Sequence, residues 1–232
     1  MKRQSEIQIP LGAGATTTAL AYPAGEPAIG AALILGHGAG AGQTSAFMVD
    51  FAHALSGLGL DLITFNFLYT EQRRRIPDRG PALEACYRSV IDTVRAKVGS
   101  AQRFLFIGGK SMGGRIATQV AASDRELPFA GLVLLGYPLH PPGRPAERRD
   151  KHLPAIARPI LFVQGSRDTF GTPPQLAPIV DVLRPVPTLR IVEGGDHSFK
   201  LPSKDPSAQA GVYANVQQDI VTWIRSVVIS AP

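Results

Sequence analysis

Three polar residues that can cooperate in nucleophilic catalysis each follow an apolar stretch of the chain. The first is Ser111, within the G-x-S-x-G motif GKSMG at positions 109–113. The apolar run before this motif predicts a buried strand over 104–107, and the residues after it predict a helix. A serine at such a strand-to-helix turn is held in strained backbone geometry with an exposed hydroxyl, so small residues must flank it. The motif therefore predicts Ser111 as a nucleophile.

The other two residues are an acid and a histidine that a serine nucleophile needs. A serine hydroxyl requires a base within hydrogen-bond reach, and the base requires an acid that fixes its tautomer. Asp168 follows the apolar run PILFVQ, and His197 follows the last predicted strand. Because ligands gather at the carboxyl ends of parallel strands, we expect Ser111, Asp168 and His197 to converge there. Asp196, next to His197, is a competing acid.

A tetrahedral intermediate of acyl transfer also needs two N–H donors. The backbone of Met112 supplies one, because it opens a helix where free N–H groups and the helix dipole favour an anion. The second donor is expected in the loop LGHGAGAGQT after a predicted strand over 31–35, with Ala39 as first choice and Gly40 as second. We expect His37 to brace this loop rather than to react.

Two glycine-rich stretches resemble phosphate-binding motifs, but neither one fits. A P-loop that ended in GKS would need a glycine where Phe104 lies inside the apolar strand. A dinucleotide fingerprint in the first glycine-rich loop would need a third glycine where Gln43 stands. We therefore expect no nucleotide or other cofactor. No Cys/His pair has the spacing of zinc ligands, so we expect no metal either.

The remaining segments alternate between strands and helices. Strands are expected at 6–10, 15–23, 31–35, 61–67, 104–107, 131–136, 159–164 and 188–192. Helices are expected at 45–58, after the GKSMG motif, and at 81–98, 172–184 and 211–228, with one helical turn near Pro154. The first two strands should form an antiparallel edge pair. This alternation predicts a mostly parallel central sheet with helices on both faces, in a single domain over 1–232.

Composition narrows the class of protein. The chain has 232 residues, of which 44% are hydrophobic and 18% charged, so it can bury a sizeable core and is not a disordered polar chain. Apolar runs such as 29–35 are too short to span a bilayer, and residues 1–10 lack a secretory signal. Cys86 is the single cysteine, so no internal disulfide can form. These features predict a cytoplasmic protein without a membrane partner.

The net charge of +6 is concentrated in two arginine-rich segments, 71–80 and 144–151. Each segment follows a predicted strand, so in a parallel sheet both loops emerge on the same side as Ser111. Two interpretations stay open: a solvated basic surface, or a rim of arginines that attracts anionic substrates. Nucleic-acid binding ranks below both, because no recognised nucleic-acid-binding module is present.

Together, these residues resemble the α/β-hydrolase superfamily. The motifs LGHGAGAG, FNFLY, GGKSMGGR, GYPLHPPG and GGDHSF are similar to a bacterial branch whose relatives include a testis-expressed protein and a chromatin-complex subunit. Dienelactone hydrolases are more distant relatives, with a cysteine nucleophile where this chain has serine. The resemblance implies an α/β-hydrolase fold, with Ser111, Asp168 and His197 as catalytic triad and the backbone of Ala39 and Met112 as oxyanion hole.

Many hydrolases of this fold carry a helical cap, but only residues 137–158 separate the relevant two predicted strands. We therefore expect a minimal cap or none, over an open cleft. Residues near strand ends or in the glycine-rich loop are candidates to line it, although core packing is the alternative for each aromatic. They are Gly38, Gly40, Phe47, Phe67, Tyr69, Leu139, Phe170 and Phe199. His140 and His152 either line the pocket or lie on the loop surface.

The expected function is that of a serine hydrolase acting on a small-molecule ester, lactone or thioester through an acyl-enzyme. The alternative is a non-catalytic interaction module that keeps the fold, as the chromatin-complex relative suggests. Lys110 and Arg115 lie beside the motif without an expected chemical role, and we expect them to be surface or packing residues. The sequence leaves the oligomeric state open.

Overall fold

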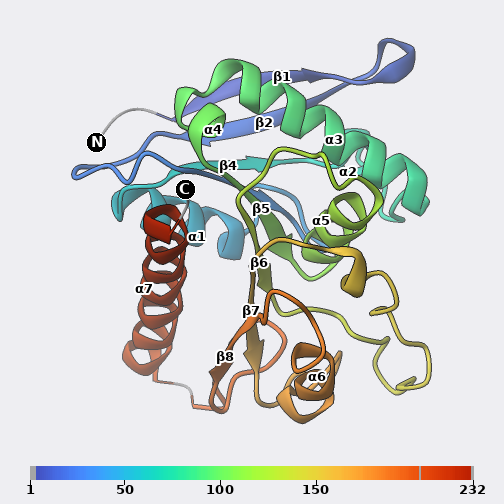
Figure 1. The fold of residues 1–232 in the computed structure, drawn as a ribbon, viewed down its shortest axis with the longest axis vertical. Coiled ribbons are helices and arrows are strands. Elements are labelled where there is room, and N and C mark those ends of the chain that lie inside the picture. The colour runs from blue at the N-terminus through green and yellow to red at the C-terminus, as the bar shows by residue number, and fades with distance from the viewer. Residues whose placement is uncertain (1–3, 204, 231–232) are drawn as a thin grey trace.

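A single eight-stranded sheet forms the centre of the computed structural model, which describes residues 4–203 and 205–230 (Figure 1). The strand order is β1-β2-β4-β3-β5-β6-β7-β8. The strands are β1 Ser5–Pro10, β2 Thr16–Tyr22, β3 Ala32–Gly36, β4 Asp61–Phe65, β5 Leu105–Lys110, β6 Gly131–Leu135, β7 Ile160–Gly165 and β8 Thr188–Val192. β2 pairs antiparallel with β1 and β4, and the other pairs are parallel. The predicted fold class is confirmed.

Helices cover both faces of this sheet. They are α1 Ala46–Gly57, α2 Leu68–Glu71, α3 Gly80–Lys97, α4 Gly99–Arg103, α5 Met112–Ser123, α6 Pro173–Val180 and α7 Pro206–Ser230, with two 3-10 turns, η1 Gly12–Gly14 and η2 Leu153–Ala155. α1 and α7 lie on one face, whereas α3, α5 and α6 lie on the other (Figure 1). No helix among the described residues is both long and apolar enough to cross a membrane.

The central strands are buried along their whole length, which explains their continuous apolar sequences. Successive side chains of a strand point to opposite faces, so Leu105 and Ile107 pack in the core under α3 and α5. Phe106, between them, packs in the opposite core with residues of α1 and α7. Each strand thus joins two hydrophobic layers, which makes the sheet a rigid base for its carboxyl-end loops.

Several predicted boundaries differ from the structure. The predicted strand over 61–67 ends at Phe65, because the following residues turn into the short helix α2. The last helix begins at Pro206 rather than at position 211, since proline fits the first turn of a helix, where its missing N–H costs nothing. The short helices α2 and α4 were not predicted, because one turn is too short to show a periodic pattern. The prediction of one domain over 1–232 stays a prediction.

The connection between β6 and β7 lies wholly within the described residues and has the single turn η2 as its regular structure. This matches the expected minimal cap. Within the sheet, the parallel register pairs Gly36 of β3 with Gly109 of β5, and Lys110 of β5 with Leu135 of β6. The loops that leave these strands therefore begin side by side at the carboxyl ends of the central strands.

Candidate active site

Ser111 occupies the sharp turn between β5 and α5. Its φ of 51° and ψ of −114° put a non-glycine residue in a sparsely populated region. Such a conformation costs about 1–3 kcal/mol and persists where the surroundings impose it. Here β5 fixes one side of the turn, and the N–H of Arg115 donates to the Ser111 carbonyl to start α5 on the other. The hydroxyl is thereby held above the carboxyl end of the sheet.

The glycines of the motif allow this turn because backbones meet there. A Cβ added to Gly109 or to Gly113 would collide with the carbonyl oxygen of Gly36 on the neighbouring strand. Gly109 also has a φ of 157°, at the edge of the region that favours glycine. The motif is therefore glycine at both ends because α5 and β5 pack directly against β3.

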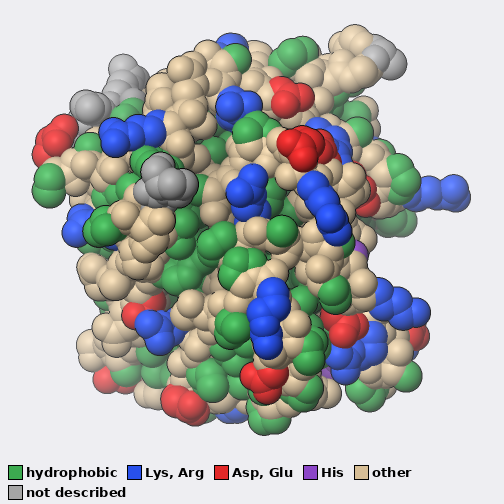
Figure 2. Space-filling model, in the orientation of Figure 1, with side chains coloured by type: hydrophobic (Ala, Val, Ile, Leu, Met, Phe, Trp, Pro, Cys, Tyr) green, Lys and Arg blue, Asp and Glu red, His purple; other side chains and the backbone are tan. Residues whose placement is uncertain are grey.

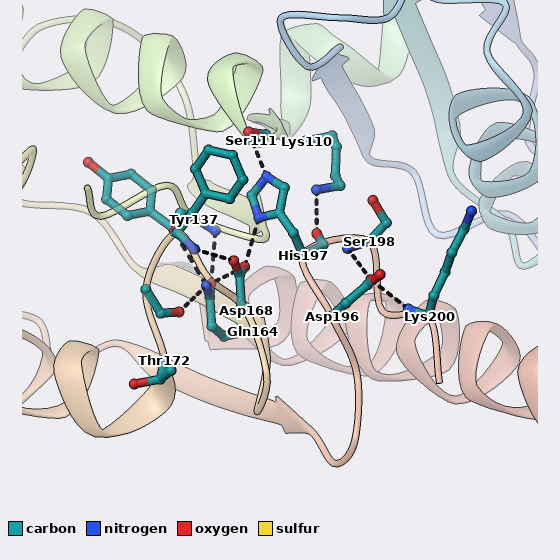
Figure 3. A network of polar contacts seen from close by, with 12 residues as sticks. Lys110, Ser111, Tyr137, Gln164, Asp168, Thr172, Asp196, His197, Ser198 and Lys200 are labelled. Atoms are coloured by element: carbon teal, nitrogen blue, oxygen red, sulfur yellow. Dashed lines mark hydrogen bonds and ion pairs between the residues drawn. The ribbon is translucent and has the colours of Figure 1, made fainter. Parts of the chain in front are cut away.

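Ser111, His197 and Asp168 form a continuous chain of hydrogen bonds (Figure 3). His197 Nε2 lies 2.8 Å from Ser111 Oγ, and His197 Nδ1 lies 2.8 Å from Asp168 Oδ2. The carboxylate favours the tautomer with the proton on Nδ1, which leaves Nε2 free to accept the serine proton. Asp168 is fully buried, whereas the His197 side chain keeps 20% of its surface exposed toward the cleft.

Asp168 is held in place by donors that leave one direction for the histidine. The Phe170 N–H donates to Oδ1 at 2.8 Å, and Gln164 Nε2 donates to Oδ2 at 2.7 Å. Gln164 is fully buried at the end of β7, and its Oε1 accepts the N–H of Tyr137 at 2.8 Å. Gln164 was not singled out in the sequence, although a polar residue that ends the apolar run PILFVQ was the available signal.

The competing acid, Asp196, has a different role in the structure. Its Oδ1 accepts the N–H groups of Ser198 at 2.7 Å and Lys200 at 2.9 Å, so it closes the loop that carries His197 (Figure 3). The His197 ring itself is bounded by Phe170, which stacks on it with ring centroids 4.1 Å apart and an interplanar angle of 27°. Asp196 thus shapes the loop, and Asp168 contacts the ring.

Lys110, expected at the surface or in packing, lies buried beneath His197. Its Nζ donates to the backbone carbonyl of His197 (Figure 3). The same Nζ sits 5.8 Å from the centre of the Phe47 ring. Burial lowers the pKa of Lys110 to about 8, while the nearby Asp168 and Asp196 act in the opposite direction. The hydrogen bond from Lys110 to the His197 carbonyl joins the end of β5 to the loop that carries His197. It therefore helps to fix the position of His197 relative to Ser111.

The glycine-rich loop after β3 is braced from behind by His37. Phe67 N–H donates to His37 Nε2 at 3.2 Å, so Nδ1 carries the proton and donates to the Gly38 carbonyl at 2.8 Å. Burial lowers the pKa of His37, although the bond to Gly38 opposes this. In a trans peptide the N–H points opposite to the carbonyl. The bond to the Gly38 carbonyl therefore directs the Ala39 N–H away from His37.

Tyr69 fixes the next peptide of the same loop. Its hydroxyl donates to the Ala39 carbonyl at 2.8 Å, from a side chain that is 2% exposed. Ala39, Gly40 and Met112 all line the same cleft as Ser111, with Met112 at the first position of α5. The predicted oxyanion donors Met112 and Ala39, and the second choice Gly40, thus lie together at the wall that contains Ser111.

The cleft has a volume of about 620 Å³ and contains Ser111 and His197 in its wall. Of the residues predicted to line it, Gly38, Gly40, Phe47 and Phe170 do so. The other four are placed elsewhere, because their side chains pack inward and are at most 2% exposed. They are Phe67, Tyr69, Leu139 and Phe199.

His140 and His152 do not line the cleft. His140 is buried, with Nδ1 2.9 Å from the Pro141 carbonyl and Nε2 3.3 Å from Gln175 Oε1. His152 Nε2 lies 2.8 Å from the hydroxyl of Thr118 on α5. Both histidines therefore fasten the β6–β7 connection to the body of the protein, rather than forming a loop surface.

The eight-stranded sheet, the strained serine after β5 and the serine–histidine–aspartate contacts define the class of α/β hydrolases. The chain belongs to the α/β-hydrolase family, because residues 30–225 match that family's alpha/beta hydrolase domain. The resemblance seen in the sequence motifs is thereby confirmed at the level of the superfamily.

Solved structures of α/β hydrolases resemble the whole chain. An α/β serine hydrolase without lid from Xanthomonas campestris has a TM-score of 0.73 at 19% identity, over 96% of each chain. Dienelactone hydrolase from Anabaena variabilis has a TM-score of 0.70 at 18% identity, over 93% of this chain and 95% of that one. Est1E from Butyrivibrio proteoclasticus, solved with ferulic acid bound, has a TM-score of 0.70 at 14% identity, over 92% and 99%. At these identities the likeness is one of fold.

Proposed function

We propose that this protein is a serine hydrolase that cleaves a small carboxylic ester, lactone or thioester through an acyl-enzyme on Ser111. The observation that carries the proposal is the unbroken chain from Ser111 Oγ through His197 to the buried Asp168, with 2.8 Å at each step. Structural relatives described as serine hydrolases and an esterase support the same chemistry.

In the first half of the reaction, His197 Nε2 accepts the proton of the Ser111 hydroxyl while Oγ attacks the substrate carbonyl. The Asp168 carboxylate stabilises the imidazolium that forms and keeps its orientation. The N–H groups of Ala39 and Met112 donate to the oxyanion of the tetrahedral intermediate. The protonated His197 then delivers its proton to the leaving alcohol or thiol, and the acyl group stays on Ser111.

In the second half, the same residues act on water. His197, neutral again, accepts a proton from a water molecule that attacks the acyl carbonyl, and the same N–H donors hold the second oxyanion. Collapse of this intermediate returns the proton to Ser111 Oγ and releases the carboxylic acid. The partial exposure of His197 and the connection without a helical cap leave a path for this water.

Labelling with a fluorophosphonate probe tests the proposal, since the probe traps an activated serine. We expect the wild-type protein to be labelled and the Ser111→Ala variant not to be. Circular dichroism of both proteins controls for folding. A folded wild-type protein that stays unlabelled, and that hydrolyses no p-nitrophenyl ester, would instead favour the non-catalytic interaction module.

A further inference from the structure

Two arginines without an acidic partner share the cleft with Ser111. Arg115 lies on α5, four residues after Ser111, and its N–H donates to the Ser111 carbonyl at 3.0 Å. Arg149 enters from the connection between β6 and β7, and both arginines line the same cleft as His197. Among the described residues, no carboxylate oxygen lies within 4.0 Å of either guanidinium.

The two arginines are held by different anchors. Arg115 Nη1 donates to Gln119 Oε1 at 3.1 Å, whereas its Nε is buried without an acceptor among the described residues. For Arg149 the backbone is fixed: its N–H donates to the Leu139 carbonyl at 2.9 Å, and its carbonyl accepts the buried Tyr137 hydroxyl at 2.6 Å. A buried N–H without an acceptor leaves part of its hydrogen-bonding energy unrealised.

Two arginines in the same connection as Arg149 differ from it because they are already paired. Arg144 contacts Glu147 at 3.0 Å and Arg148 contacts Asp150 at 2.6 Å, with both arginine side chains well exposed. Basic and acidic side chains also lie intermixed on the face of the molecule in Figure 2. Asp78 is the acidic residue that lines the cleft, and Arg74 contacts it in a short ion pair.

The two positive charges of Arg115 and Arg149 repel each other in the absence of an anion. Burial is the main cause that lowers the pKa of Arg115, and the positive charge of Arg149 lowers it further, while Tyr137 and Glu84 act in the opposite direction. Two like charges at one wall are stabilised when an anion binds between or beside them. His152 Nε2 is already in contact with the Thr118 hydroxyl, at 2.8 Å.

We propose that Arg115 and Arg149 form a carboxylate-binding subsite, so that the substrate is an ester or thioester that also carries a free carboxylate a few bonds from the scissile carbonyl. The inference rests on the proposed function, because Ser111 attacks the same molecule that the arginines hold. In this proposal Arg115 and Arg149, which have no acidic partner among the described residues, bind the substrate. Arg144 and Arg148, which have acidic partners, form solvated surface.

The kinetic test compares two esters of equal acyl length, mono-p-nitrophenyl glutarate and p-nitrophenyl pentanoate. We expect the wild-type protein to favour the glutarate ester in kcat/KM, and the preference to fall at high salt. Arg115→Met and Arg149→Met keep the apolar volume and remove the charge, so each should reduce the preference by about tenfold or more. Arg148→Met, next to Arg149 but paired with Asp150, is the matched control and should leave the preference unchanged.

A second readout does not depend on catalysis. Calorimetric titration with glutarate should show binding to the wild-type protein and to Arg148→Met, and weaker binding to Arg115→Met and Arg149→Met. If the fluorophosphonate does not label the folded protein and neither p-nitrophenyl ester is hydrolysed, the proposed function fails, and glutarate binding alone decides the subsite. A loss of preference or of glutarate binding in both cleft variants, but not in the control, supports the proposal. If both cleft variants fold and match the wild type in ester preference and in glutarate binding, the proposal is overturned.

Discussion

At the scale of single residues, Ser111 combines a reactive group with an unfavourable backbone conformation. Glycine accepts a φ of 51° without steric cost, whereas alanine meets the same strain as serine. We predict that Ser111→Gly and Ser111→Ala both abolish ester hydrolysis, but that Ser111→Gly is the more stable of the two by about 1 kcal/mol. Denaturant unfolding of the two variants measures the difference. Equal unfolding free energies would show that the turn is not strained.

Lys110 gives the stability of the protein a defined pH dependence. Its pKa is about 8 in the folded protein, below the value of 10.5 that the unfolded chain has. Between these values the unfolded state binds more protons, so the free energy of unfolding rises with pH in this window. For a shift of this size the gain is about 3 kcal/mol relative to a protein that lacks the group.

The measurement compares wild type with Lys110→Met between pH 7 and pH 10.5, the upper limit being the unfolded pKa. The difference between their unfolding free energies should change in favour of the wild type as pH rises. Lys200→Met, at an exposed position of the histidine loop, serves as the control for removing a lysine side chain from this region. A pH-independent difference for Lys110→Met would mean that the buried amine titrates as it does in water.

At the scale of elements, direct backbone contact between α5 and β3 positions the serine. A methyl group on Gly113 would displace α5 from the Gly36 carbonyl, and overpacking of this kind costs about 1–3 kcal/mol. We predict that Gly113→Ala lowers the unfolding free energy by such an amount and lowers kcat/KM further than stability alone explains, because Ser111 moves with the helix. Esterase assays on the folded variant and denaturant unfolding test both effects.

The control for this substitution is Gly211→Ala in α7. A Cβ at Gly211 meets no heavy atom within 4 Å, and alanine is the better helix former by about 1 kcal/mol. We expect this variant to be slightly more stable than the wild type with the same activity. Equal, small effects of the two substitutions would contradict the close packing of α5 on β3.

The same elements show how far the sequence could predict the site. Ser111, Asp168 and His197 were predictable because each follows an apolar run, and the ends of parallel strands share one edge of the sheet. Gln164 and Lys110 were not, since their roles depend on contacts with residues far away in the chain. The buried position of Phe199 was equally invisible, because an aromatic residue after a strand can turn toward either the cleft or the core.

At the scale of the whole molecule, the chain alternation was sufficient to predict the sheet, its mostly parallel strands and its covered faces. What it could not give is which charges face the cleft. The segments 71–80 and 144–151 are both rich in arginine, yet Arg149 lines the cleft while Arg144 and Arg148 face outward with acidic partners. Side-chain direction within an irregular loop has no periodic signal, so only the folded arrangement separates them.

The short β6–β7 connection leads to a prediction about substrate scope. With η2 as the regular structure in this connection, and with His197 partly exposed, the described part of the chain places no helix over Ser111. A leaving group can therefore extend into solvent instead of fitting an enclosed pocket. We predict that, for one acyl group, kcat/KM differs by less than about tenfold between phenyl and naphthyl esters, since the extra ring gains or loses little contact.

Matched acyl chains separate this prediction from selectivity on the acyl side. The comparison uses acetate esters of phenol and 2-naphthol, whose leaving groups have similar acidity, so that the chemical step is alike in both. Viscosity dependence of kcat/KM identifies any contribution from diffusion. A preference for phenyl acetate far beyond tenfold, at matched leaving-group acidity, would require walls around the leaving group that the open cleft does not have, and would point to closure of the 71–80 loop over Ser111 on binding.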